Sequence, residues 1–331
     1  MRFTRALVVS IAALSLAASA QTTELRLVST AWTPFTNQAG QPRFALDLVE
    51  AALGRIGVKS TTTIVEAAQF TPSLLSGKFD GSAAAWKDAD RDRVLLFSQP
   101  YLQNRLILVA RRGGDVSAAK LAELDGKRIA IVEGYSYGDA IDQSGPTFVR
   151  SRTDEDSVRL LLDGKVDYAL IDDLVVQYIV NNYPEEARAR LQIGTTPLIT
   201  RPLHLAVRRS LADAESIVSR FNAQLRGLIT DRTYHRLLHV DWIQADVDGD
   251  GIPEYVPQSD LMGKAEPKRA YNLFFTDPTT TPQPQPIVKG RFLIGGSIYD
   301  GWTTVPDRYK VEDPKRPDPN KATLGVFRFV W

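Results

Sequence analysis

The chain has 331 residues and contains no cysteine. A structural disulfide, a cysteine nucleophile, a thiolate metal site and a lipid anchor on an N-terminal cysteine are therefore excluded. Forty Lys and Arg residues face 39 Asp and Glu residues, and neither sign forms a long block. We therefore expect neither nucleic acid nor an anionic membrane surface as the main partner. The length is sufficient for two domains, each with its own hydrophobic core.

The first 20 residues have the pattern of a secretory signal peptide. Arg2 and Arg5 give a positively charged start, residues 6–17 are almost wholly apolar, and Ala18-Ser19-Ala20 supplies the small residues that a signal peptidase requires. The apolar run is too short to span a bilayer comfortably, which disfavours a membrane anchor. We expect cleavage before Gln21 and a protein that is periplasmic or secreted and not embedded in a membrane.

Strand-like and helix-like segments alternate in the part of the chain that follows. Apolar residues three and four apart predict an amphipathic helix from Leu46 to Ile56, stopped by Gly57. A shorter helix is expected over 71–76, ended by Gly77. The strand-like segments are 25–28, 61–65, 80–85 and 106–109. This alternation predicts a parallel-rich α/β sheet with helices on both faces.

The same alternation restarts after residues 111–114. The strand-like segments are 128–132, 168–171 and 203–207, and the helix-like segments are 158–162, 211–229 and 233–240. Two similar α/β halves in one chain favour a ligand-binding crevice between them, at the carboxyl ends of the strands.

The composition changes after Asp246. Eleven of the 19 prolines lie in the final 86 residues, and residues 279–286 form a low-complexity linker. The segments 287–299 and 323–330 have β-rich patterns interrupted by turns that contain proline and charged residues. We interpret this region as an appended module and not as a continuation of the α/β part.

A series of short motifs follows the α/β part of the chain: Trp32-Thr33-Pro34-Phe35, residues 44–48, residues 74–80, Asp90-Arg91 followed by residues 97–101, residues 124–130 and residues 164–172. In this order the motifs resemble those of the type II periplasmic solute-binding proteins of family 3, the amino-acid-binding group. The resemblance covers about Glu24 to Ile243, and the order of the motifs makes it more specific than any one of them.

The resemblance implies a two-lobed, periplasmic-binding-protein-like α/β fold of type II, here with a β-rich C-terminal extension. Two segments would cross between the lobes, near 103–106 and 201–204, and hinge closure would enclose a ligand. The corresponding division is 1–20 for the signal peptide, 21–104 and 204–244 for lobe 1, 105–203 for lobe 2, and 245–331 for the extension with its calcium loop and proline-rich and β segments.

Two charged residues occupy positions where the family binds the polar groups of an amino acid. Arg91 lies where the family places the carboxylate-binding arginine, and a planar guanidinium can bind a carboxylate through two hydrogen bonds. By composition alone, an arginine in such a charge run is more typically solvated. Asp172 matches the acid that binds the amino group. We expect the adjacent Asp173 to cap the next helix.

The loop between Gly134 and Gly138 is the third candidate contact. Ser136, Tyr137 and their backbone N–H groups could donate to the ligand carboxylate, because loops that precede helices bind anions well. A glycine-rich loop alone discriminates poorly between functions.

Aromatic residues are expected to form the wall of the pocket, although each tryptophan could equally be ordinary core packing. Trp32 and Trp86 are the main candidates. The second aromatic residue that the family carries near Ala67 is absent, but Phe70 is close in sequence. Alanines at 83–85 replace the hydroxyl residues typical of amino-acid binders. These differences predict a more apolar pocket and a ligand that is an aromatic or otherwise modified carboxylate.

An acidic segment after the last predicted helix has the pattern of a calcium loop. Carboxylates at alternate positions, followed by glycine, can wrap around a hard cation. Pro257 stands where an EF-hand carries glutamate, so the segment resembles the short calcium loop of integrin-type and dockerin-like repeats; a solvated acidic turn is the alternative. The predicted Ca²⁺ ligands are Asp246, Asp248, Asp250, Glu254 and the backbone carbonyl of Ile252.

Two histidines, His235 and His239, are four apart on a predicted helix and could in principle bind a metal. The segment matches the terminal helix of the family, for which no metal is implied, and no nearby glutamate completes a zincin-like motif. We assign them no metal.

The leading hypothesis is a binding protein that captures a small carboxylate between its lobes for an ABC-type importer or a receptor, with no catalytic residue. The first alternative is an enzyme on the same fold, such as a lyase of the cyclohexadienyl dehydratase kind, with Glu66, Glu133 or Asp173 as general acid. In the second alternative, the extension carries the function and the α/β part serves as a docking or sensory module.

Overall fold

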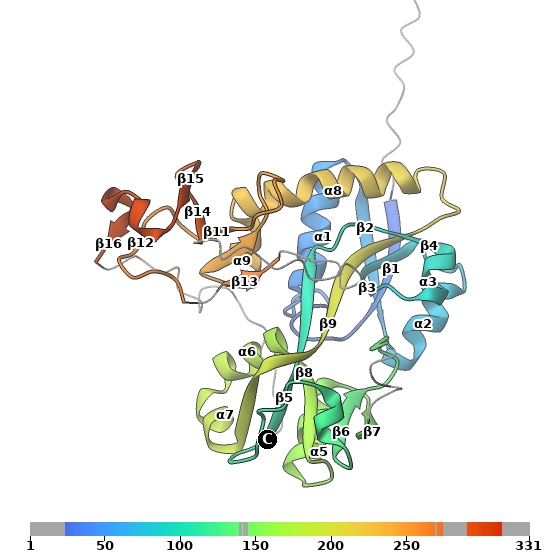
Figure 1. The fold of residues 1–331 in the computed structure, drawn as a ribbon. Helices are drawn as coiled ribbons and strands as arrows, with labels where there is room; N and C mark the ends of the chain where they lie inside the picture. Colours follow the sequence, from blue (N-terminus) through green and yellow to red (C-terminus); the bar gives the residue numbers. More distant parts are fainter. Residues whose placement is uncertain (1–23, 139–140, 142–144, 269, 274–289, 313–331) are drawn as a thin grey trace, which may run out of the picture.

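We analysed a computed structural model that describes residues 24–138, 141, 145–268, 270–273 and 290–312 (Figure 1). The predicted signal peptide, the linker at 279–286 and the β-like segment at 323–330 lie outside the described residues. Across the described ranges, no helix combines the length and the apolar character needed to cross a membrane.

The first lobe has the alternating elements that the sequence predicts. Leu46, Val49 and Leu53 bury one face of the first helix against the sheet, as their spacing requires. Strand β1 pairs in parallel with both β2 and β3. The elements are β1 (Glu24–Thr30), α1 (Phe44–Arg55), β2 (Lys59–Val65), α2 (Ala67–Leu75), β3 (Gly81–Trp86), α3 (Ala89–Val94) and β4 (Leu95–Phe97).

Two long antiparallel strands, β5 (Leu102–Arg111) and β9 (Leu191–Arg208), run through both lobes (Figure 1). Gln103 pairs with Pro202 and Asn104 with Arg201, so the two predicted crossing segments lie side by side. The strand order is β2-β1-β3-β9-β5-β8-β6-β7, with β4 also paired to β9. The sheet is therefore parallel at its two ends, as predicted, and antiparallel at its centre.

The second lobe follows β5 and returns through β9. Strand β6 pairs in parallel with β7 and β8, and β8 pairs antiparallel with β5. Its elements are the 3₁₀ helix η1 (Leu121–Leu124), β6 (Arg128–Val132), β7 (Thr147–Ser151), α5 (Asp154–Leu162), β8 (Tyr168–Asp172), α6 (Asp173–Asn182) and α7 (Pro184–Arg190).

One local expectation was wrong. Asp172, and not Asp173, caps helix α6, because its side chain accepts the backbone N–H of Leu174 at 2.8 Å. Asp173 is the first helical residue, and its carboxylate instead accepts a hydrogen bond from Nε of Arg105 at 2.7 Å. Either adjacent carboxylate can reach the free N–H groups of a helix start, so the sequence does not decide between them.

Helices α8 (Ala214–Thr230) and α9 (Thr233–Leu238) complete the first lobe, where both contact α1. Figure 1 shows α8 lying across the end of this lobe. His235 of α9 is buried, and its Nε2 lies 2.9 Å from the carbonyl oxygen of Val256, while His239 ends the helix. Burial lowers the pKa of His235 to about 4. His235 therefore joins the lobe to the extension as a neutral side chain.

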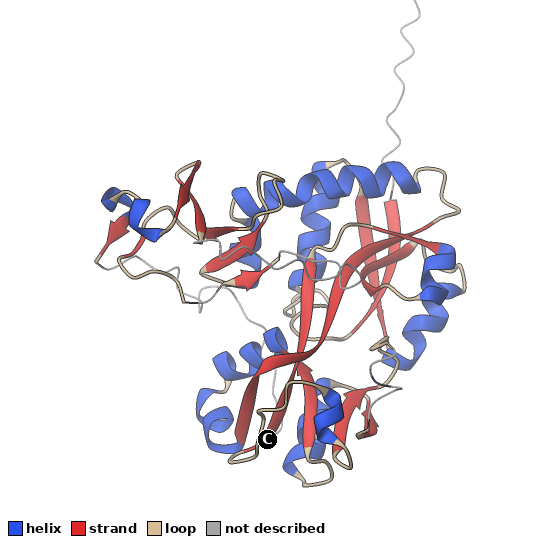
Figure 2. Cartoon of the chain, viewed as in Figure 1, coloured by secondary structure: helices blue, strands red, loops and turns tan. Residues whose placement is uncertain are grey.

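The C-terminal extension is β-rich, as predicted (Figure 2). Its five-stranded sheet has the order β13-β10-β11-β14-β15, and β12 pairs with β16. Met262, Phe292, Ile294 and Val305 form its small core. The elements are β10 (Trp242–Ala245), β11 (Glu254–Pro257), β12 (Met262–Gly263), β13 (Tyr271–Asn272), β14 (Arg291–Ile294), β15 (Ser297–Asp300), η2 (Trp302–Thr304), η3 (Asp307–Tyr309) and β16 (Lys310–Val311).

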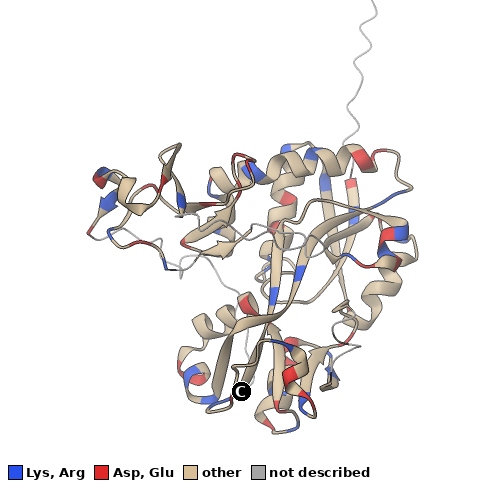
Figure 3. Ribbon diagram, in the orientation of Figure 1, with Lys and Arg blue, Asp and Glu red and all other residues tan. Residues whose placement is uncertain are grey.

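Charged residues of both signs are interspersed over the lobes and the extension (Figure 3). This distribution agrees with the balanced composition of the chain.

Candidate functional site

A small cavity lies between the two lobes. Its volume of about 30 Å³ has room for only about two water molecules, less than an amino acid needs. Eleven residues from both lobes line it: Ser29, Thr30, Trp32, Phe70, Ala84, Trp86, Arg91, Gly134, Tyr135, Ser136 and Leu203.

Arg91 places a guanidinium in this cavity, and its side chain is held from several sides. Asp88 caps α3 by accepting the Arg91 backbone N–H at 2.8 Å, and its carboxylate lies 3.3 Å from Nε of Arg91. The two terminal nitrogens donate to the Trp86 carbonyl at 2.9 Å and to Oγ1 of Thr71 at 2.8 Å. The guanidinium also lies over the ring of Phe70, at 5.3 Å. Because a guanidinium has five N–H donors, it can bind a ligand carboxylate in addition to these contacts.

The environment of Arg91 makes its charge costly to leave unpaired. The residue is only 2% exposed, and burial lowers its pKa. A buried cation is stable only when anions or acceptors surround it. A carboxylate entering the cavity would supply a second anion beside Asp88.

The rings of Trp32, Trp86 and Tyr135 line the cavity and contact one another, and the rings of Phe35 and Tyr137 pack against them. Trp32 stacks on Phe35 at 4.2 Å and meets Trp86 edge to face at 5.8 Å. The ring of Tyr135, from the second lobe, lies 5.4 Å from Trp32 and 5.6 Å from Trp86. The ring of Tyr137 lies 5.7 Å from Trp86. The tryptophans were expected here from the sequence, whereas Tyr135 was not.

The loop after β6 closes the cavity from the second lobe. Ser136 donates its hydroxyl to Asp88 at 2.7 Å. Gly134 has a φ of +80°, and a Cβ atom there would lie 2.7 Å from the carbonyl oxygen of Ala67, so only glycine allows this approach of the lobes. The described conformation is therefore a closed one.

Two of the predicted ligand contacts do not line the cavity. The hydroxyl of Tyr137 accepts the backbone N–H of Val132 at 2.9 Å. Asp172 is buried and, besides capping α6, accepts hydrogen bonds from Nδ2 of Asn104 and the backbone N–H of Arg105, both at 3.0 Å. Burial and the neighbouring Asp173 raise the pKa of Asp172. The other five predicted residues, Trp32, Phe70, Trp86, Arg91 and Ser136, line the cavity together.

Asp154 is a buried acid beside the cavity that the sequence did not indicate. It is the first residue of α5, and Thr153 caps this helix. Burial raises the pKa of Asp154 to about 8; Glu155 adds to this rise, and a hydrogen bond from Trp32 opposes it. An acidic first helical turn is commonly exposed, so only the tertiary contact with Trp32 reveals its position.

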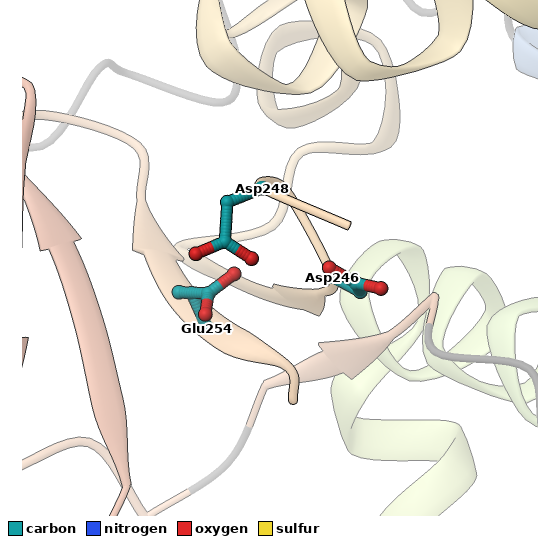
Figure 4. A group of neighbouring side chains, drawn as sticks. All are labelled: Asp246, Asp248 and Glu254. Carbon is teal, nitrogen blue, oxygen red and sulfur yellow. The ribbon is translucent and has the colours of Figure 1, made fainter. Parts of the chain in front are cut away.

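The predicted calcium loop brings three carboxylates together (Figure 4). Oxygen atoms of Asp246, Asp248 and Glu254 lie within 4.8 Å of one another. The carboxylate of Asp246 accepts the backbone N–H groups of Gly249 at 2.6 Å and Gly251 at 3.1 Å, which folds the loop around it.

The remaining two predicted ligands are Asp250 and the backbone carbonyl of Ile252. The side chain of Asp250 accepts the backbone N–H of Ile252 at 2.8 Å and does not belong to the group of three converging carboxylates.

A positive side chain from the extension also faces this loop. Arg291 of β14 approaches Asp250 at 2.6 Å, Glu254 at 3.0 Å and Asp248 at 3.1 Å. This contact could not be predicted from local patterns, because Arg291 lies beyond the low-complexity linker.

The model of the family described as bacterial extracellular solute-binding proteins, family 3, matches residues 27–245. The chain belongs to this family. The match covers both lobes and ends with β10, so the family 3 part holds the cavity, while the calcium loop and most of the extension follow it.

Individual relatives agree with this assignment. The virulence sensor protein BvgS of Bordetella bronchiseptica is 28% identical over 160 residues, which are 48% of this chain and 12% of the sensor. The membrane-bound lytic murein transglycosylase F of Maricaulis maris is 30% identical over 175 residues, 49% of this chain and 38% of that protein. The chain therefore spans less than half of the length of these two relatives.

A solved structure shows a similar fold. A mutant of ArgBP from T. maritima is 25% identical with a TM-score of 0.53, and the match covers 65% of this chain and 93% of that protein. The match thus spans nearly the whole of that protein and leaves about a third of this chain unmatched.

Proposed function

We propose that this family 3 protein captures a small carboxylate-bearing ligand between its lobes and presents it to an ABC-type importer or a receptor. The observation that carries the proposal is the buried guanidinium of Arg91 in a cavity between the lobes. Closure around a ligand removes water from the contact between a carboxylate and a guanidinium, which strengthens it.

The rest of the cavity favours a ligand with an aromatic or otherwise apolar body. Trp32, Trp86, Phe70 and Tyr135 offer ring surfaces, and Ala84 contributes a methyl group. The ring of Tyr135 already contacts both tryptophans, tilted against Trp32 and edge to face with Trp86. When the lobes reopen, an aromatic carboxylate, whether an amino acid or a related acid, could make similar contacts with the tryptophans.

Calorimetric titration with natural amino acids and aromatic carboxylates tests this proposal. The variant Arg91→Ala should lose most of the affinity, and Arg91→Lys should recover only part of it, because an ammonium cannot form the bidentate contact. Arg93→Ala is the matched control, since Arg93 lies on the same helix with its side chain 76% exposed. Affinity of folded Arg91→Ala within about threefold of wild type would refute the carboxylate assignment.

A lyase on the same fold is the alternative function, and the raised pKa of Asp154 is the observation that supports it. Burial raises this pKa to about 8, so the carboxyl group holds a proton at neutral pH that a general acid could donate. The earlier candidates are less suitable: Glu66 and Glu133 are exposed, and Asp173 pairs with Arg105. Product formation from any bound carboxylate, followed by mass spectrometry over time, would favour the enzyme.

We also propose that the loop from Asp246 to Glu254 binds Ca²⁺ as a structural ion. Asp246, Asp248, Asp250 and Glu254 carry four carboxylates, and the single guanidinium of Arg291 balances only one of them. Glu254 is fully buried, and its Oε1 accepts no hydrogen bond from the described residues, although Arg291 lies 3.0 Å away. A divalent cation would neutralise the remaining negative charge of the loop, and the carboxylates would supply the oxygen ligands that calcium prefers.

A further inference from the structure

The C-terminal extension touches the α/β part at the segment where β5 crosses between the lobes. Strand β8 ends at Asp172, which pairs with Leu106. Residues 102–105 of β5 lie beyond the end of β8, and one edge of this segment pairs with β9. The backbone groups on the other side need other partners, since unpaired backbone N–H and C=O groups are costly when buried.

Tyr271 of the extension supplies partners for Gln103. Its hydroxyl accepts the Gln103 backbone N–H at 3.2 Å and donates to the Gln103 carbonyl at 3.1 Å. The residue is only 4% exposed, and its ring lies 5.0 Å from the guanidinium carbon of Arg105. Strand β13, which carries Tyr271, is in turn paired with β10 in the sheet of the extension. Tyr271 is therefore held by one module and binds the crossing strand of the other.

The next two residues of the crossing strand, Asn104 and Arg105, contact a cavity residue and the second lobe. Asn104 accepts a hydrogen bond from Nε1 of Trp86, a cavity residue, at 2.7 Å. The same amide donates to Asp172, the cap of α6, at 3.0 Å. Arg105 pairs with Asp173 at 2.7 Å. Gln103, Asn104 and Arg105 thus connect the extension, the cavity and the second lobe through consecutive positions.

We propose that the extension sets the balance between open and closed lobes, with Tyr271 as the residue that stabilises closure. Hinge motion requires the backbone of the crossing segments to change its angles. The two hydrogen bonds between Tyr271 and Gln103 are made with the lobes closed. An opening that changes the backbone at Gln103 would weaken them, so they favour the closed state. The proposal concerns the hinge and does not depend on which ligand the cavity binds.

Distance measurement between two spin labels in the full-length protein tests this proposal. The chain has no cysteine, so Ser216→Cys on α8 and Ala122→Cys on η1 introduce the only labelling sites, both at exposed positions. Pulsed electron–electron double resonance then gives the populations of short and long distances. Without any added ligand, Tyr271→Phe removes both hydrogen bonds to Gln103 and should lower the ratio of closed to open protein by at least about fivefold, the factor expected for the loss of one ordinary hydrogen bond.

A control variant separates this effect from a general loss of stability in the extension. Tyr255→Phe makes the same chemical change in β11, where the ring stacks on Phe292 at 5.3 Å, and should leave the distance distribution unchanged. Circular dichroism should show that both variants are folded. Equal distributions in wild type and Tyr271→Phe would overturn the proposal, as would an equal shift in Tyr255→Phe. Neither result bears on ligand capture by Arg91.

Discussion

The variant Asp154→Asn should change how stability depends on pH. Asp154 is 9% exposed at the start of α5, and burial raises its pKa to about 8 against a hydrogen bond from Trp32 that lowers it. Among the described residues, no cation offsets the burial of Asp154. The neighbouring Glu155 raises its pKa further, and the phenols of Tyr135 and Tyr137, which also lie nearby, are neutral. Asparagine has a similar shape and cannot ionise.

The sign and size follow from proton linkage. The folded protein keeps the Asp154 proton up to about pH 8, whereas the unfolded chain releases it near the ordinary value of 3.8. Stability contributed by this group is therefore fully present below about pH 4 and is lost as the pH rises to about 8. The difference between these two pKa values, at about 1.4 kcal/mol for each pH unit, sets a ceiling of about 6 kcal/mol. Local relaxation reduces this, and we expect at least about 2 kcal/mol.

Urea unfolding followed by tryptophan fluorescence at pH values from 5 to 9 measures this effect. The free energy of unfolding of wild type should fall relative to that of Asp154→Asn as the pH increases. Asp163→Asn, at an exposed site at the end of the same helix, is the control and should follow wild type. Parallel pH profiles for wild type and Asp154→Asn would show that Asp154 ionises normally in the folded protein and would refute the reasoning.

Three further predictions concern the calcium loop, Arg291 and lobe closure. Millimolar Ca²⁺ should raise the melting temperature and chelator should lower it, by linkage to the folded state; retention of calcium by Asp248→Ala would contradict the ligand assignment. Arg291→Met should bind Ca²⁺ more tightly if the guanidinium competes for the same carboxylates, and unchanged affinity would show that it does not. Ser136→Ala removes the hydrogen bond to Asp88 and should weaken ligand binding about fivefold; unchanged affinity in a titration would show that this contact does not support closure.

Local patterns in the sequence were sufficient to predict much of the fold. The apolar spacing in α1 and the short apolar runs of β1, β6 and β8 correspond to elements within a few residues of the predicted limits. Strands β5 and β9 were predicted only in part. Their crossing portions carry Gln103, Asn104 and Pro202, which are not typical of strands, and become strands because long-range partners pair with them.

The candidate site, like the fold, could be predicted only where local patterns determine it. Arg91 and Trp32 lie in short motifs, Trp86 follows the alanines that replace the family's hydroxyl residues, and the structure brings all three to one cavity. Tyr135 and Asp154 could not be predicted, because each is defined by a contact between lobes and not by a local pattern. Asp172 has the capping role that was expected of Asp173, since the choice between the two carboxylates depends on Asn104 and Arg105 about 70 positions away.

Native mass spectrometry of freshly purified protein tests the central claim most directly. The claim is that Arg91 holds a carboxylate ligand in the cavity between the lobes. Wild type and the control Arg93→Ala should carry the same small molecule, which should prove to be a carboxylic acid after release, and Arg91→Ala should carry none. Equal occupancy in Arg91→Ala, or a released molecule without a carboxyl group, would contradict the account.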